Sequence, residues 1–155
     1  MNEPLNNTED VARAIFSPLM VDEYGNILRS AFALRHNEDY ISVCRMATRS
    51  WKEDMSSIPQ GESRRLYGYT VLNTGQIREL SFNFANKAAV FDVVDKHTEK
   101  NLSHAGIVIM FDGSLLRGDR HLTVKPFPDD VPIDGFVLRM QTKLAVLAQK
   151  NMIKL

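Results

Sequence analysis

The sequence lacks the features of secreted and membrane-spanning proteins. It holds one cysteine in 155 residues, so no disulfide can form within the chain. The longest run of apolar or glycine residues, 105–111, is much shorter than the about 20 residues of a membrane-spanning helix. The first residues show neither the basic nor the apolar stretch of a signal peptide. We therefore expect a cytoplasmic protein without a membrane segment.

An excess of one charge is also missing, because 19 basic residues balance 19 acidic ones. Proteins that hold nucleic acids by neutralising phosphates carry a strong basic excess, so we expect no non-specific nucleic-acid binding. A small anionic ligand needs only a few local charges, and a protein partner needs none. Zero net charge also lowers the barrier to self-association, which leaves a homo-oligomer open.

Motifs for metals and cofactors are absent as well. The four histidines lie far apart, and none has the spacing from Cys44 that zinc sites show. The segment 113–118 lacks the Lys-Ser/Thr ending of a phosphate-binding loop. No serine lies in a Gly-x-Ser-x-Gly context. The sequence predicts no metal and no cofactor.

What is present favours one α+β domain over residues 1–155, with residues 1–8 disordered. The apolar fraction of 44% suffices for a core. We expect a small mixed or antiparallel sheet of five or six short strands with two or three helices. Segment 11–16 fits a strand or a helical turn. The expected strands are 27–34, 40–46, 66–72, 88–94, 105–111 and 152–155, and the expected helices are 47–55, a turn at 76–80 and 135–150.

The C-terminal segment has the clearest pattern. Phe136, Met140, Leu144 and Leu147 recur at helical spacing, which predicts a long amphipathic helix with these four side chains buried. Asp134 stands where it could cap the helix start. In the strands 88–94 and 105–111, continuous apolar residues indicate burial on both faces.

His104 is the first candidate for chemistry, because it stands where a polar loop enters the apolar strand 105–111. Side chains at strand ends often line pockets, and a neutral imidazole can act as a base near neutral pH. The structural alternative is a ring that caps the strand end by a hydrogen bond to the backbone.

Charged and hydroxyl side chains gather around the turn before the strand 40–46. Arg35, Asp39 and Arg45 are candidate ligand-binding residues, and Ser42 is a candidate catalytic residue. Strand alternation places Ser42 and Cys44 on one face and Arg45 on the other. The alternative is a solvated loop whose charges pair with each other. Cys44 is expected to be a buried, unreactive thiol.

Scattered positions resemble a pattern found in small uncharacterised bacterial proteins. The pattern includes Arg13, Ser30-Ala31-Phe32, Ser42 and Ser103-His104-Ala105. That group has no established activity. The resemblance implies that Arg13, Ser42 and His104 belong to one constellation, with Arg13 as a further ligand-binding residue.

Two hypotheses about function remain open. The first is a small enzyme, or a ligand-binding relative of one, that takes a phosphate-bearing or nucleotide-like ligand. Small intracellular toxins and ADP-ribosyl-transferring domains have this size, an analogy of scale only. The second is a non-catalytic protein–protein interaction module. Convergence of Arg13, Ser42 and His104 on a concave pocket would favour the first hypothesis, and a flat apolar patch would favour the second.

Overall fold

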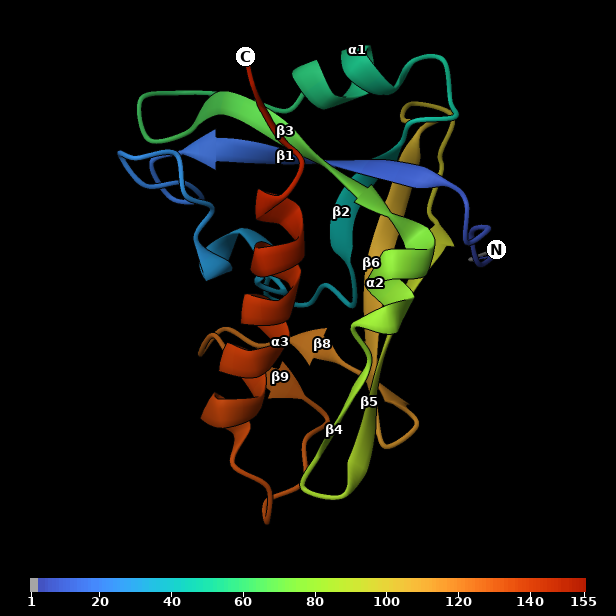
Figure 1. Ribbon diagram of the computed structural model, residues 1–155, viewed down its shortest axis with the longest axis vertical. Coiled ribbons are helices and arrows are strands. Elements are labelled where there is room, and N and C mark those ends of the chain that lie inside the picture. Colours follow the sequence, from blue (N-terminus) through green and yellow to red (C-terminus); the bar gives the residue numbers. More distant parts are fainter. Residues whose placement is uncertain (1–2) are drawn as a thin grey trace.

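A large antiparallel sheet organises the chain, whose residues 3–155 are described by a computed structural model (Figure 1). Its eight strands follow the order β10-β3-β1-β2-β6-β5-β4, with β7 paired to β6, and β8 and β9 form a separate pair. The strands are β1 (Asp10–Ser17), β2 (Ile41–Arg45), β3 (Arg65–Asn73), β4 (Phe82–Phe84), β5 (Lys87–Asp95), β6 (His104–Phe111), β7 (Ser114–Leu115), β8 (Arg117–Gly118), β9 (Val124–Lys125) and β10 (Met152–Lys154).

The predicted α+β class is confirmed, and within residues 3–155 three α-helices and one 3-10 helix accompany the sheet. They are η1 (Arg29–Phe32), α1 (Trp51–Ser56), α2 (Thr74–Glu79) and α3 (Ile133–Gln149). Figure 1 shows α3 lying along the sheet. Within residues 3–155, no helix combines the length and hydropathy that crossing a membrane requires.

The long C-terminal helix is confirmed as α3. Phe136, Met140 and Leu144 are fully buried, and Leu147 is 7% exposed. The predicted cap is wrong, because Pro132 is the N-cap residue and its side chain makes no capping hydrogen bond. Asp134 lies instead in the first turn, where a negative charge still interacts favourably with the helix dipole.

The two faces of the sheet carry different cores. Val11, Ile15 and Val43 belong to the main core, which also contains the buried face of α3. Because side chains alternate along a strand, Ala14 and Cys44 point to the opposite face. There they join a smaller core that includes Phe16 from β1 and Met55 from α1. The second face therefore has a thin cover made by α1 and the loop that follows it.

The sheet opens between β1 and β2. Only two residue pairs join these strands, Val11 with Arg45 and Ala12 with Cys44. The rest of β1 continues its pairing with β3 alone, as far as Ser17. Figure 1 shows β1 and β3 running across the direction of β5 and β6, as expected for a strongly twisted sheet. Beyond Ala12, the edge of β2 that faces β1 has no strand partner among the described residues.

The predicted strand 27–34 is wrong. Four of its residues form η1, in which Ala31 N–H donates to Leu28 O and Ala33 N–H donates to Ser30 O. The Ser30 hydroxyl donates to Leu19 O (2.7 Å), a local tie that holds the turn. Burial does not follow the apolar alternation of the sequence, because the adjacent Ala31 and Phe32 are both buried, together with Leu34.

Further differences concern short strands and the N-terminal segment. β4 and β7 have three and two residues, too few to show alternation, and they bring the sheet to eight strands in place of the expected five or six. The equally short β8 and β9 form a separate pair. Val90 on β5 is 38% exposed, so that strand is not buried on both faces. Residues 3–8, expected to be disordered, lie beside β5, where Leu5 N–H donates to Val93 O (2.9 Å) and the Leu5 side chain is buried. Residues 1–2 of that prediction lie outside the described part.

Candidate functional site

A pocket of about 240 Å³ lies where β1 and β2 separate, and consecutive residues of both strands line it, so side chains from both faces of the sheet contribute. We call it the central pocket. Its floor includes β1, β2 and the start of β6, and its walls include the loop 33–40 and residues of α1 and of the segment 58–64. The charged and polar side chains among its lining residues are Arg13, Arg35, Glu38, Tyr40, Ser42, Asp54, Arg64, Asn101 and His104.

Ser42 and His104 meet at the floor of this pocket. Ser42 lies opposite Gly106 in the β2–β6 ladder, so its side chain shares a face with that of His104, two residues away. The Ser42 Oγ and His104 Nε2 atoms are 3.2 Å apart. A Cβ on residue 106 would lie 2.7 Å from the Tyr40 Cβ, so Gly106 provides the space that Tyr40 occupies. The Tyr40 ring then packs edge-on against the His104 ring, with centroids 5.5 Å apart.

The His104 ring is held in its neutral form. Burial lowers its pKa below the usual 6.5, the charge of Lys96 acts in the same direction, and a hydrogen bond to the Lys96 backbone partly offsets both. A folded-state pKa below the unfolded value means that stability is lost as pH falls below about 6.5. At pH 7 the ring is neutral, and Nε2 can accept the proton of the Ser42 hydroxyl when Nδ1 carries the ring proton.

Arg13 fills the gap between β1 and β2. Its guanidinium donates to Ser42 O through Nη1 (2.8 Å) and to Ala31 O through Nε (3.1 Å) and Nη2 (2.8 Å). The side chain thus replaces the strand that β2 lacks at this point. A guanidinium has five N–H groups, and two of Arg13 take part in no hydrogen bond within residues 3–155.

Two further arginines reach the same pocket. Burial, followed by repulsion from Arg35 and Arg64, lowers the pKa of Arg13 to about 10, and the charge of Glu38, which also lines the pocket, offsets part of this shift. The Arg64 guanidinium lies over the Phe16 ring, 4.2 Å from its centroid. Burial and the charge of Arg35 lower the pKa of Arg64 as well. Across the described chain, none of these three arginines forms an ion pair with a carboxylate.

The backbone of Arg35 is fixed by the approach of Gly118. A Cβ on residue 118 would lie 2.0 Å from Arg35 O, so only glycine permits this contact. Asn37 N–H and Gly118 O form a further hydrogen bond between the same segments (3.0 Å). The Arg35 side chain is exposed, but these contacts fix the position of its backbone.

Asp54 lies at another wall of the pocket. Its Oδ2 accepts from the Ser103 hydroxyl (2.6 Å), from Ser103 N–H (3.2 Å) and from the Ser50 hydroxyl (3.0 Å). The bond from the Ser103 side chain is the main cause that holds the pKa of Asp54 below its usual value. Cys44, beside Ser103, is 8% exposed, and burial raises the pKa of its thiol.

Of the predicted site residues, the structure brings Arg13, Arg35, Ser42 and His104 to one pocket. Arg45 lies elsewhere, at the far end of β2, where Nε and Nη2 donate to the two Glu9 carboxylate oxygens (2.6 and 3.1 Å).

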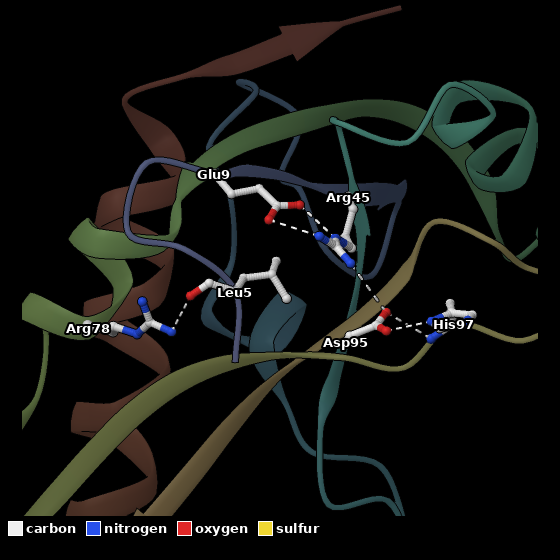
Figure 2. Close-up of polar contacts among 6 residues, drawn as sticks. All are labelled: Leu5, Glu9, Arg45, Arg78, Asp95 and His97. Carbon is white, nitrogen blue, oxygen red and sulfur yellow. Dashed lines mark hydrogen bonds and ion pairs between the residues drawn. The ribbon is translucent and has the colours of Figure 1, made fainter. Parts of the chain in front are cut away.

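Figure 2 shows this network continuing from Arg45 to Asp95 (3.6 Å) and from Asp95 to His97 (2.5 Å). Nearby, Arg78 donates to Leu5 O. Arg45 therefore ties the N-terminal segment to the sheet. Asp39 also lies outside the central pocket, 3.6 Å from the Lys96 ammonium.

Sequence reasoning missed Arg64, Asp54 and Tyr40. The sequence around Arg64 is typical of a surface loop. No local pattern indicates that the loop folds back and places Arg64 over Phe16 of β1. Asp54 has the appearance of a solvated residue on a short helix.

Comparison with known proteins adds no further signal, because no family model, no curated protein and no solved structure matches this chain.

Proposed function

We propose that the central pocket binds a small phosphate-bearing ligand and that Arg13, Arg35 and Arg64 hold its phosphate. The observation that carries this proposal is the meeting of three arginines, none of them paired with a carboxylate in residues 3–155, at one pocket of about 240 Å³. Phosphate is a common ligand of clustered arginines, because one planar guanidinium can donate two parallel hydrogen bonds to two phosphate oxygens.

The electrostatics of the pocket support an anion as the missing partner. Arg13 is 9% exposed, and a buried charge is costly without an opposite charge close by. Repulsion among the three guanidinium groups adds to this cost. Glu38 offsets part of this cost, and a phosphate dianion would offset more of it and could accept hydrogen bonds from the two unused Arg13 N–H groups.

The convergence of the candidate residues also supports a ligand site over an interaction module. Arg13 comes from β1, Ser42 from β2 and His104 from β6, and the three line one concave space. An interaction module requires no such convergence. Exposed apolar residues such as Leu138 and Val146 lie on α3, away from this pocket.

The Ser42–His104 contact favours a transfer reaction at the bound phosphate. In the proposed step, the Ser42 oxygen forms a bond to phosphorus while the ester bond to the leaving alcohol breaks. His104 Nε2 takes the Ser42 proton and gives it to the leaving oxygen. Water then attacks the phosphorus of the phosphoserine while its bond to Ser42 Oγ breaks. His104 Nε2 accepts the water proton and returns it to Ser42 Oγ, and inorganic phosphate leaves. The arginines stabilise the charge on the transferred group.

Titration calorimetry with inorganic phosphate and with small phosphate monoesters tests the proposal. Wild-type protein is expected to bind, and Arg64→Gln and Arg35→Gln are each expected to weaken binding by about tenfold or more, the equivalent of one lost charge-assisted contact. Arg120→Gln removes a charge from an exposed loop outside the pocket and should leave the affinity unchanged. Equal weakening by all three variants would mean non-specific attraction and would contradict the proposal.

A further inference from the structure

We infer that the ligand is a polyol phosphate, such as a sugar phosphate, and that Asp54 accepts a hydrogen bond from a hydroxyl group of its polyol part. This inference rests on the proposed phosphate site and names the class of molecule attached to the phosphate.

The first support is the state of the Asp54 carboxylate. Three donors from Ser50 and Ser103 bind Oδ2, whereas Oδ1 takes part in no hydrogen bond within residues 3–155. Oδ1 is not a buried atom, and Asp54 lines the central pocket. The carboxylate is thus fixed by one oxygen and offers the other as an acceptor.

The second support is the separation of charges within the pocket. Asp54 forms no ion pair within 4.0 Å of Arg13, Arg35 or Arg64, although all four line the same space. Arg13 contacts Ser42, and Asp54 contacts Ser103, the neighbour of His104. Arg13 and Asp54 therefore reach the Ser42–His104 pair through different contacts, while Glu38, the other carboxylate of the lining, raises the pKa of Arg13.

A ligand that fits this arrangement has an anion at one end and hydrogen-bond donors at the other. The Asp54 charge repels a second phosphate or a carboxylate at its end of the pocket. An ammonium group costs more to desolvate than a hydroxyl group does. A hydroxyl group needs one acceptor, which Asp54 Oδ1 provides. Hydroxyl groups beside a phosphate define a polyol phosphate.

The experiment compares glycerol 3-phosphate with propyl phosphate, which has the same phosphate and carbon chain but no hydroxyl groups. Wild-type protein is expected to bind glycerol 3-phosphate at least about tenfold more tightly, in line with a charge-assisted hydrogen bond. Asp54→Asn, which keeps the shape of the side chain and removes its charge, should reduce this ratio about threefold or more. Glu53→Gln removes a neighbouring exposed charge on α1 and should leave the ratio unchanged.

The outcomes separate this inference from the proposed function. Equal affinities for the two esters, with both still weakened by Arg64→Gln, would overturn the polyol assignment and leave the phosphate site standing. Tighter binding of phosphoethanolamine than of glycerol 3-phosphate would also overturn it, in favour of an ammonium group. Absence of binding by either ester and by inorganic phosphate would overturn both proposals. A circular dichroism spectrum like that of wild type establishes that Asp54→Asn is folded.

Discussion

Arg13→Leu is expected to lower the free energy of unfolding by about 2–4 kcal/mol and to abolish phosphate binding. The substitution leaves the Ala31 and Ser42 carbonyl oxygens without their donors, at a cost of roughly 1–3 kcal/mol each. Relief from burying a charge offsets part of this loss. Chemical denaturation measures the first effect, and calorimetry with inorganic phosphate measures the second.

Arg13→Lys separates the two roles of this residue. Lysine keeps the positive charge but lacks the planar fork that reaches both carbonyl groups. We expect it to recover part of the phosphate affinity and little of the stability. Arg120→Leu serves as the control for loss of an exposed arginine. A stability of Arg13→Leu equal to that of wild type would show that the sheet does not need the side chain to close the gap between β1 and β2.

Phe136→Ala is expected to cost about 3–5 kcal/mol, the typical penalty for removing a fully buried aromatic ring. The Phe136 ring is fully buried and lies at the centre of an aromatic cluster. Its centroid is 5.8 Å from that of Phe82, 5.6 Å from Phe84, 4.8 Å from Phe111 and 5.1 Å from Phe127. Truncation would leave a cavity between α3 and the strands β4 and β6. The midpoint of thermal unfolding should fall by roughly 10 °C.

The matched control for this prediction lies on the same helix. Leu138 is 49% exposed, so Leu138→Ala loses little packing and should change stability by about 0.5 kcal/mol or less. If the two substitutions had equal effects, α3 would not pack through its Phe136 face. Both variants lie outside the central pocket, so phosphate affinity at low temperature should remain that of wild type.

Much of the fold could be predicted from the sequence where a repeating pattern was long enough. The helical spacing of Phe136, Met140, Leu144 and Leu147 identified α3, and the apolar runs identified β5 and β6. The failure at 27–34 has a physical cause. The residues there form a short 3-10 turn in which the adjacent Ala31 and Phe32 are both buried, and the apolar alternation of the sequence does not distinguish this turn from a strand.

The site was less accessible to prediction, because it depends on contacts between distant segments. Ser42 and His104 could be selected as candidates because a serine and a histidine can carry out chemistry and because both were expected in or beside a strand. Their contact depends on the pairing of β2 with β6, which the sequence does not specify. Arg45 and Arg35 are both arginines close to the same predicted turn, so the sequence favoured both equally as ligand-binding residues. Arg45 instead pairs with Glu9 and Asp95, which come from distant parts of the chain. Charge alone could not distinguish a structural arginine from a ligand-binding one.

The most direct test of the central claim is to follow the arginine side-chain N–H signals by NMR while inorganic phosphate is added. The claim predicts saturable shifts of the signals from Arg13, Arg35 and Arg64, with one common dissociation constant. The signals of Arg117 and Arg120, which lie outside the central pocket, should not move. Shifts of similar size at all arginines, or the absence of shifts at these three, would contradict a phosphate site in the central pocket.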